Sequence, residues 1–191
     1  MKASRVFAIG FGVIALCVLS VPNAFASLQN QATRLTFNGA VEIPGVALPE
    51  GTYWFKLLKD DADQNIVQIW NGNQKKLLAT VLAIPDYRLH TTGQTVIKFK
   101  SEHPSGLPDA IRAWFYPGTE YGHEFVYPEK TAAALAKRYG EPVLSMRNDV
   151  SANITKPAEN ATDPSVVALK HAQVQVVSPN GKETNWTGPK K

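Results

Sequence analysis

An acidic segment in the first half of the chain carries oxygen ligands at the alternating positions typical of a calcium-binding loop. Asp61, Asp63 and Asn65 form a D-x-D-x-N pattern, and oxygens with that spacing can converge on one hard cation. The sixth position is Ile66, where a calcium loop has glycine, and the twelfth is Gly72, where it has glutamate. We therefore interpret the segment as an ordinary acidic turn and keep calcium as the alternative.

The histidines and nucleophiles do not form a recognisable catalytic or metal-binding pattern. The chain has four scattered histidines, no H-x-H pair, no G-x-S-x-G motif and no phosphate-cradling glycine loop. His123 and Glu124 are neighbours in an expected strand, so their side chains should point to opposite faces. A hydrolytic pair of carboxylates with Glu120 and Glu124 stays open as an alternative. The sequence otherwise indicates no metal centre and no cofactor, and favours a protein that is not an enzyme.

Aromatic residues are the most prominent feature of the sequence. Arg112, Trp114 and Tyr116 alternate along one expected strand, so they should share one face. Large aromatic side chains are usually buried, which favours a second buried layer. An exposed platform that stacks on sugars or on a partner's peptide is the alternative. The candidate binding surface comprises Arg112, Trp114, Tyr116, Tyr121, His123 and Glu124.

Short strands separated by turn residues are expected from residue 33 to residue 127. Residues 66–70 and 76–84 should form a hairpin, with Asn71 and Gly72 in a type I′ turn. No helix of ten residues fits among the strands, so the sheet should be antiparallel. We predict a mainly β fold: an antiparallel β-sandwich or flattened barrel of about eight or nine strands.

The C-terminal third differs in composition from the strand-rich body. Good helix formers between Pro128 and Gly140 predict a short helix at residues 129–139, stable only when docked. Residues 147–191 contain a single aromatic, Trp186, and predict a largely flexible tail. Two short strands are possible within it, at residues 166–169 and 174–177. The expected domain comprises residues 27–146.

The N-terminus has the features of a secretory signal peptide. Residues 1–5 are positively charged, residues 6–21 are almost wholly apolar, and Ala24-Phe25-Ala26 resembles a cleavage site. Cleavage would remove residues 1–26 with the single cysteine, Cys17. No later apolar run reaches membrane length, so we expect an exported protein, periplasmic or extracellular, with no transmembrane segment after cleavage.

The net charge of +4 does not come from the body of the chain. Residues 27–146 contain 12 basic and 12 acidic residues, and the excess lies in the leader and the tail. A nucleic-acid-binding protein should carry clustered positive charge. We therefore expect no nucleic-acid partner.

The chain contains three further motifs: L-P-E-G-T-Y-W-F-K-L at residues 48–57, A-W-F-Y-P-G at 113–118 and H-E-F-V-Y-P at 123–128. Together these motifs resemble a group of uncharacterised secreted bacterial proteins with a small β-sandwich. The resemblance covers about residues 34–140. It implies a small secreted β fold, and because the group has no established activity it implies no catalytic residue.

These observations favour a secreted, non-catalytic binding module of the bacterial envelope, whose partner is a protein or a glycan. One alternative is a structural subunit of a surface assembly in which the tail adds a strand to another chain. A second is a small-ligand-binding or hydrolytic barrel that uses His123, Glu124 and Glu120. The sequence leaves the oligomeric state open.

Overall fold

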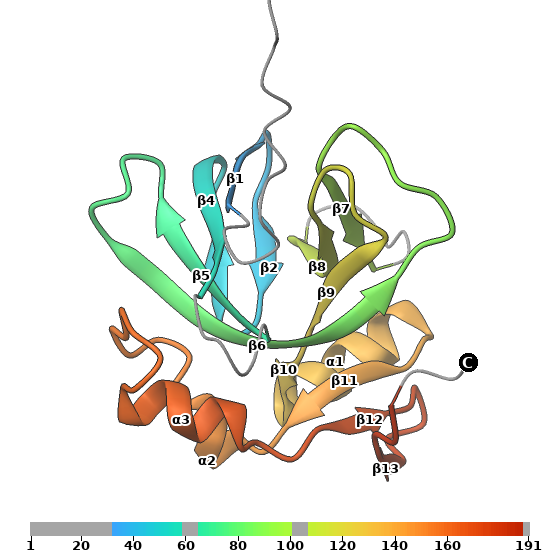
Figure 1. Ribbon diagram of the computed structural model, residues 1–191. Coiled ribbons are helices and arrows are strands. Elements are labelled where there is room, and N and C mark those ends of the chain that lie inside the picture. The colour runs from blue at the N-terminus through green and yellow to red at the C-terminus, as the bar shows by residue number, and fades with distance from the viewer. Residues whose placement is uncertain (1–31, 59–64, 101–106, 189–191) are drawn as a thin grey trace, which may run out of the picture.

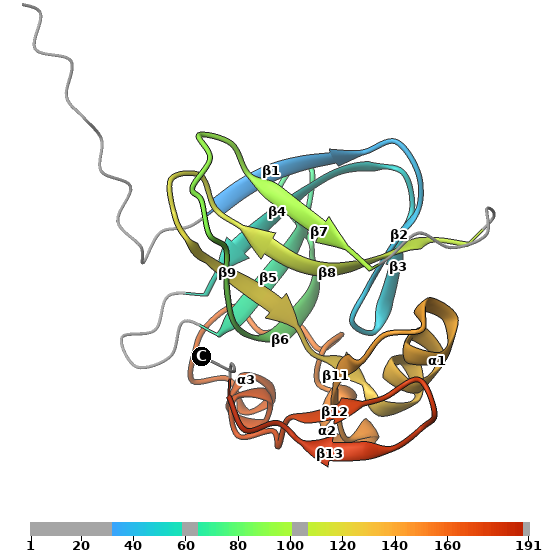
Figure 2. The same cartoon turned by 90° about the vertical axis from the view of Figure 1, so that its right-hand side faces the viewer.

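The computed structural model describes residues 32–58, 65–100 and 107–188 and has two layers (Figure 1). A curved nine-stranded sheet forms the first layer. A four-stranded sheet and the described helices form the second, which lies below the curved sheet in both views (Figures 1 and 2). The mainly β, sandwich-like fold predicted from the sequence is confirmed.

The first layer contains β1 (Ala32–Phe37), β2 (Val41–Ile43), β3 (Val46–Leu48), β4 (Gly51–Leu57), β5 (Ile66–Asn71), β6 (Leu77–Tyr87), β7 (Val96–Phe99), β8 (Asp109–Phe115) and β9 (Tyr121–Phe125). The second layer contains β10 (Tyr127–Pro128), α1 (Glu129–Tyr139), β11 (Val143–Met146), α2 (Asn148–Ser151), α3 (Pro164–Lys170), β12 (Gln175–Val177) and β13 (Glu183–Asn185).

The long strand β6 joins the two halves of the curved sheet. Residues 77–82 pair with β5, and residues 83–87 pair with β9. The strand order is β1-β4-β5-β6-β9-β8-β2-β3, and β7 pairs with β8 beside this path. Because β6 curves between its two partners, β1, β4 and β5 face β7, β8 and β9 across the interior (Figure 1).

The interior is filled by aromatic rings from both halves of the sheet. Phe55 on β4 lies 6.2 Å from Trp114 on β8, edge to face, and 6.2 Å from Phe125 on β9, stacked. Phe37 packs edge to face on Phe55 at 6.3 Å. Such offset and edge-to-face pairs add to the stability that burial of apolar area supplies. One ring from each of the three motifs, Phe55, Trp114 and Phe125, therefore lies in the core.

The expected hairpin is present, but its turn is different. Strands β5 and β6 pair antiparallel, and the backbone N–H of Asn71 donates to the carbonyl of Lys76 at 3.0 Å. The positive φ in the connection belongs to Gln74, at 60°, and not to Asn71 or Gly72. Asn71 Oδ1 accepts hydrogen bonds from the backbone N–H groups of Lys75 and Lys76, both at 3.0 Å. The type I′ prediction is wrong because this side chain organises a longer loop.

Two strand pairs depart from the expected antiparallel arrangement. Strand β2 pairs parallel with β8 at Val41–Asp109, and β10 pairs parallel with β11. Each of these pairs is joined by a chain segment long enough for a crossover, which a parallel pair needs. The expectation of a purely antiparallel sheet, which rested on the lack of long helices between the strands, is therefore wrong for these two pairs.

Helix α1 occupies the predicted residues 129–139. Pro128 precedes it, and Gly140 ends it in the left-handed conformation with φ 67°. Ala132, Leu135 and Ala136 are buried. The local signals at the two ends of the helix were sufficient to place it.

Residues 148–185 include two short helices and two short strands, α2, α3, β12 and β13, and are anchored to the rest of the chain, so the prediction of a largely flexible tail is wrong for this segment. Ile154 and Val166 have no exposed surface. The backbone N–H of Thr80 donates to the carbonyl of Ile154 at 2.8 Å, and Gln68 Nε2 donates to the carbonyl of Ala158 at 2.7 Å. Local composition could not reveal these anchors, because Thr80 and Gln68 lie far away in the sequence.

The two short strands suggested within the tail have different outcomes. Residues 166–169 lie in helix α3, which begins with Pro164, so the strand prediction there is wrong. Residues 175–177 form β12, which pairs with β11 of the same chain, so the second strand prediction is confirmed. Pro164 at the start of α3 is the signal that favours a helix.

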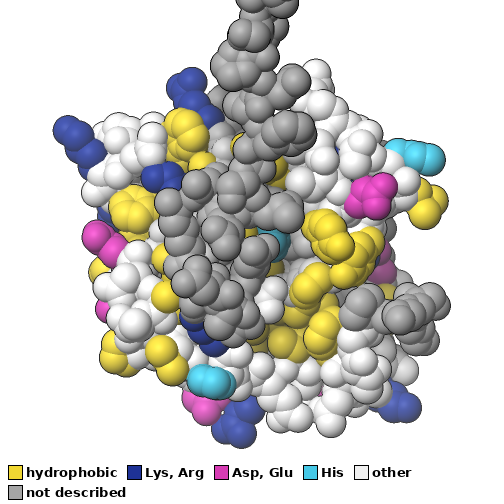
Figure 3. Space-filling view, viewed as in Figure 1, with side chains coloured by type: hydrophobic (Ala, Val, Ile, Leu, Met, Phe, Trp, Pro, Cys, Tyr) yellow, Lys and Arg dark blue, Asp and Glu magenta, His cyan; other side chains and the backbone are white. Residues whose placement is uncertain are grey.

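None of the helices in the described part of the chain is long and apolar enough to cross a membrane. The predicted signal peptide, residues 1–26, lies outside the described residues, as do Asp61 and Asp63 of the calcium candidate. On the face seen in Figure 3, Lys and Arg side chains are scattered and not gathered into one patch.

Candidate functional site

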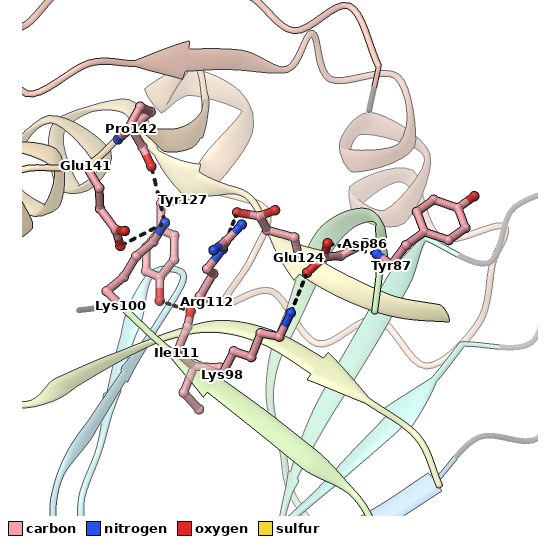
Figure 4. Close-up of polar contacts among 10 residues, drawn as sticks. All are labelled: Asp86, Tyr87, Lys98, Lys100, Ile111, Arg112, Glu124, Tyr127, Glu141 and Pro142. Atoms are coloured by element: carbon pink, nitrogen blue, oxygen red, sulfur yellow. Dashed lines mark hydrogen bonds and ion pairs between the residues drawn. The ribbon is translucent and has the colours of Figure 1, made fainter. Parts of the chain in front are cut away.

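A cleft of about 320 Å³ lies between the outer face of the curved sheet and the second layer. Figure 4 shows its polar side chains, which come from the β7–β9 wall and from the connection between α1 and β11. The lining comprises two cations, two carboxylates and an apolar wall: Lys100, Arg112, Glu124, Glu141, Pro142, Leu144, Val176 and Trp186.

Arg112 reaches the cleft because β8 carries an extra residue there. Lys98 on β7 lies opposite Ala113, and the next residue, Phe99, lies opposite Ile111. A bulge of this kind interrupts the alternation of side chains between the two faces. Arg112 therefore lies on the same face as Glu124, and its Nε donates to Glu124 Oε1 at 3.1 Å. The expectation that Arg112 shares a face with Trp114 is wrong for this reason.

Lys100 is the most buried charged group of the cleft. Its side chain is 3% exposed. Its Nζ donates to the carbonyl of Pro142 at 3.3 Å and lies 3.8 Å from Glu141 Oε1. Burial lowers the pKa of Lys100, while the negative charges of Glu124 and Glu141 oppose that effect. The ammonium is held by the segment that follows α1, so this contact joins the two layers.

The apolar wall of the cleft belongs to the second layer. Leu144 on β11 lies opposite Val176 on β12. The backbone N–H of Trp186 donates to the carbonyl of Val174 at 3.1 Å, which fixes the end of the tail beside β12. Trp186 is half-buried, packs against the core and lines the cleft. The site thus offers one aromatic surface beside two ion pairs.

Tyr127 fixes the second layer against the wall that carries Arg112. Its hydroxyl donates to the carbonyl of Ile111 at 2.7 Å and lies 3.0 Å from the carbonyl of Glu42. The ring has no exposed surface. Burial raises the pKa of Tyr127, so the hydroxyl stays protonated and remains a donor.

The row of charges continues beyond the cleft along the outer face. Lys98 Nζ lies 3.8 Å from Asp86 Oδ2 (Figure 4). The same ammonium lies 4.5 Å from the centre of the Phe115 ring, and the Arg88 guanidinium lies 5.2 Å from it. The ring lies against Gly122, where a Cβ would be only 2.5 Å away. Phe115 is fully buried under these neighbours.

Trp114 is not the exposed platform that the sequence allowed as an alternative. It has no exposed surface and packs on Phe55 inside the sandwich. Its Nε1 has no hydrogen-bond partner among the described residues. The predicted binding surface that includes Trp114 is therefore wrong, and the interpretation of Trp114 as a buried residue is correct.

His123 also lies inside, next to Trp114. The two ring centres are 5.4 Å apart, and His123 is 7% exposed. Burial lowers the pKa of His123 to about 4. Glu124 points to the outer cleft, so the two neighbours occupy opposite faces as the strand pattern predicted. Glu120 is exposed at the turn before β9, so the three residues named for a hydrolytic barrel, His123, Glu124 and Glu120, do not converge on one site.

The remaining predicted site residues lie at the rim of the sheet. Tyr121 is 52% exposed and packs on Tyr87 at 5.0 Å. The carbonyl of Tyr116 accepts a hydrogen bond from Arg88 at 3.2 Å. Of the six predicted site residues, the cleft brings together only Arg112 and Glu124.

Sequence reasoning missed six of the eight lining residues, among them the other two charged groups and the aromatic ring: Lys100, Glu141 and Trp186. A signal existed for Trp186, because it is the only aromatic in the last 45 residues and such a ring is seldom left in a flexible tail. Lys100 and Glu141 follow ordinary elements, and only tertiary packing distinguishes them from surface charges.

The described residues contain no group of three or more side chains that could hold a metal ion. Asn65, the one described member of the calcium candidate, lies just before β5. Comparisons of the chain with protein-family models, curated proteins and solved structures give no match.

Proposed function

We propose that the protein is an exported, non-catalytic module of the bacterial envelope that binds a glycan in the cleft between its two layers. The observation that carries the proposal is the presence of an aromatic ring, Trp186, beside two ion pairs in one cleft. A protein partner is the alternative occupant of the same cleft. The predicted leader, residues 1–26, supports export.

The chemistry of the lining suits a polar ligand without net charge. Arg112 and Lys100 can only donate hydrogen bonds, whereas the Glu124 and Glu141 carboxylates accept them. A sugar hydroxyl both donates and accepts, so neighbouring hydroxyls can engage both kinds of group. A strongly anionic or cationic ligand would face two groups of its own sign, which disfavours binding.

The ring of Trp186 supplies the apolar part of such a site. The carbon-bound hydrogens of a pyranose form an apolar face, and a half-buried indole offers a flat surface against which that face can pack. Leu144 and Val176 extend this surface. The cleft volume of about 320 Å³ lies at the lower end of ordinary small-molecule sites, which fits one or two sugar units better than a long chain.

Two features favour binding over catalysis. Glu124 and Glu141 each lie beside a cation, at 3.1 Å from Arg112 and 3.8 Å from Lys100. The neighbouring His123 points away from them into the core. A surface assembly in which the tail adds a strand to another chain has less support, because β12 already pairs with β11 of its own chain.

A glycan array, followed by calorimetry on the best ligand, tests the proposal. Trp186→Ala should weaken binding by at least about tenfold, as is typical for a buried aromatic contact. Trp54→Ala is the matched control, because Trp54 lies outside the cleft and donates its Nε1–H to the carbonyl of Gly72; it should change affinity by less than about twofold.

Circular dichroism shows whether both variants keep the fold. The proposal fails if no glycan binds the purified protein, or if Trp186→Ala binds the best ligand as tightly as the original chain. If the protein binds another protein and no glycan, and Trp186→Ala weakens that binding, the cleft is a site for a protein partner and the glycan proposal is wrong.

A further inference from the structure

A second hollow, separate from the cleft, lies on the side of the sheet formed by β3 and the β5–β6 hairpin. Its volume is about 610 Å³, larger than that of the cleft, and none of the described residues lines both. Most of its wall is apolar. The apolar residues that line it include Val46, Leu48, Pro49, Leu77, Leu78 and Pro157.

Hydrogen bonds and close packing hold the walls of this groove in place. The Tyr53 hydroxyl donates to the carbonyl of Pro49 at 2.8 Å, which fixes the segment after β3. The hairpin turn before β3 rests on the tail, since a Cβ at Gly45 would lie 3.2 Å from Ile154 Cγ2. The groove therefore exists before any ligand arrives, and little ordering is needed on binding.

The polar groups of the groove include two donors from the connection between β5 and β6. Lys76 is exposed and is the only charged side chain among the described lining residues. Asn71 Oδ1 already accepts two backbone N–H groups. The Asn71 side chain therefore has its Nδ2 donor left for a ligand, beside the three donors of the Lys76 ammonium.

We propose that this groove binds a fatty acid, with its hydrocarbon chain along the apolar wall and its carboxylate at Lys76 and Asn71. An apolar wall with donors on one side matches a ligand that is apolar along its length and accepts hydrogen bonds at one end. The charge of the ligand is complementary to that of the groove, because none of the described residues that line it is a carboxylate. A glycan would leave its hydroxyls unpaired against the apolar wall.

Calorimetry with octanoate, decanoate and dodecanoate, each below its critical micelle concentration, tests the hydrocarbon site. Each methylene that enters the groove should tighten binding about fourfold. Decanol, which has the same number of carbon atoms as decanoate and no charge, should bind about fivefold more weakly than decanoate.

Lys76→Gln tests the position of the carboxylate, and Lys75→Gln is its matched control. Lys75 is the adjacent exposed lysine and does not line the groove. Lys76→Gln should weaken decanoate binding about fivefold and leave decanol binding unchanged, whereas Lys75→Gln should change neither. Both substitutions lie at exposed positions, so the fold should be unaffected.

The proposal is overturned if the purified protein does not bind dodecanoate, if affinity does not depend on chain length, or if Lys76→Gln and Lys75→Gln behave alike. Binding of an apolar peptide in place of all three fatty acids would also overturn it. Because the ligands and lining residues differ from those of the cleft, these results do not bear on glycan binding.

Discussion

The buried imidazole of His123 should make the protein lose stability in mild acid. Its ring lies inside the sandwich beside Trp114 and opposite Pro85 on β6. In the folded state burial lowers its pKa to about 4, compared with 6.5 for an unperturbed histidine. Between these two values the unfolded chain binds a proton that the folded chain does not bind. Acidification therefore favours unfolding over this range.

The magnitude follows from the two pKa values. At 1.36 kcal/mol per pH unit, the difference between 6.5 and about 4 corresponds to a total of about 3 kcal/mol. This contribution of the neutral His123 to the unfolding free energy is fully present above pH 6.5 and is lost progressively as the pH falls towards 4. At pH 4.5 about 2.5 kcal/mol should already be lost, a large fraction of the stability of an ordinary domain.

Urea unfolding at pH 7.5 and pH 4.5 measures this loss. His123→Gln removes the titrating ring. The drop in unfolding free energy from pH 7.5 to pH 4.5 should therefore be about 2.5 kcal/mol smaller in this variant than in the original chain. His171→Gln is the matched control because His171 is exposed, and it should keep the full loss. An NMR titration of the imidazole signals gives the pKa of His123 directly.

Two results would refute this reasoning. The first is a His123→Gln variant that loses as much stability on acidification as the original chain. The second is a His123 signal that titrates near 6.5 in the folded protein, which would mean that the ring is open to water.

Two further substitutions test the packing that supports the cleft, both by urea unfolding. Gly122→Ala should lower the unfolding free energy by about 1–3 kcal/mol, because the added methyl group would lie 2.5 Å from the Phe115 ring. Its control is Gly93→Ala, where the methyl group meets no atom within 4 Å and the loss should be less than about 0.5 kcal/mol. Ile154→Ala should cost about 2–5 kcal/mol because Ile154 is fully buried under the sheet. Its control is Val167→Ala, at a side chain that is 39% exposed, which should lower the unfolding free energy much less. An equal loss for a variant and its control, in either of the two comparisons, would contradict the packing described.

The features that sequence could predict are those with local causes. Helix α1 begins after Pro128 and ends at Gly140, and both signals lie in the helix's own sequence. The β5–β6 hairpin likewise follows from two strand-forming, mostly apolar segments with turn-forming residues between them. The turn between them could not be predicted in detail, because Asn-Gly suits a two-residue turn equally well and only the bonds of the Asn71 side chain select the longer loop.

The features that sequence missed depend on contacts between distant segments. Alternation of side chains along β8 predicts Arg112 on the same face as Trp114. The bulge in β8 instead puts Arg112 on the opposite face. A bulge is set by the register with the neighbouring strand, which no single strand encodes. The tail was judged flexible from its composition, but Ile154 and Val166 find a hydrophobic surface that the first layer leaves uncovered.

These two errors have one consequence for the candidate site. The cleft needs Arg112 on the outer face and Trp186 docked beside β12, so it does not exist in a chain with regular strands and a free tail. Its Lys100–Glu141 ion pair also joins the layers, since Lys100 follows β7 while Glu141 and Pro142 follow α1. A ligand that bridges Arg112 and Trp186 would favour the docked tail over the undocked one, and by linkage a tail that docks more firmly would bind that ligand more tightly. Ligand affinity and tail stability should therefore change together, even for substitutions such as Ile154→Ala that do not contact the cleft.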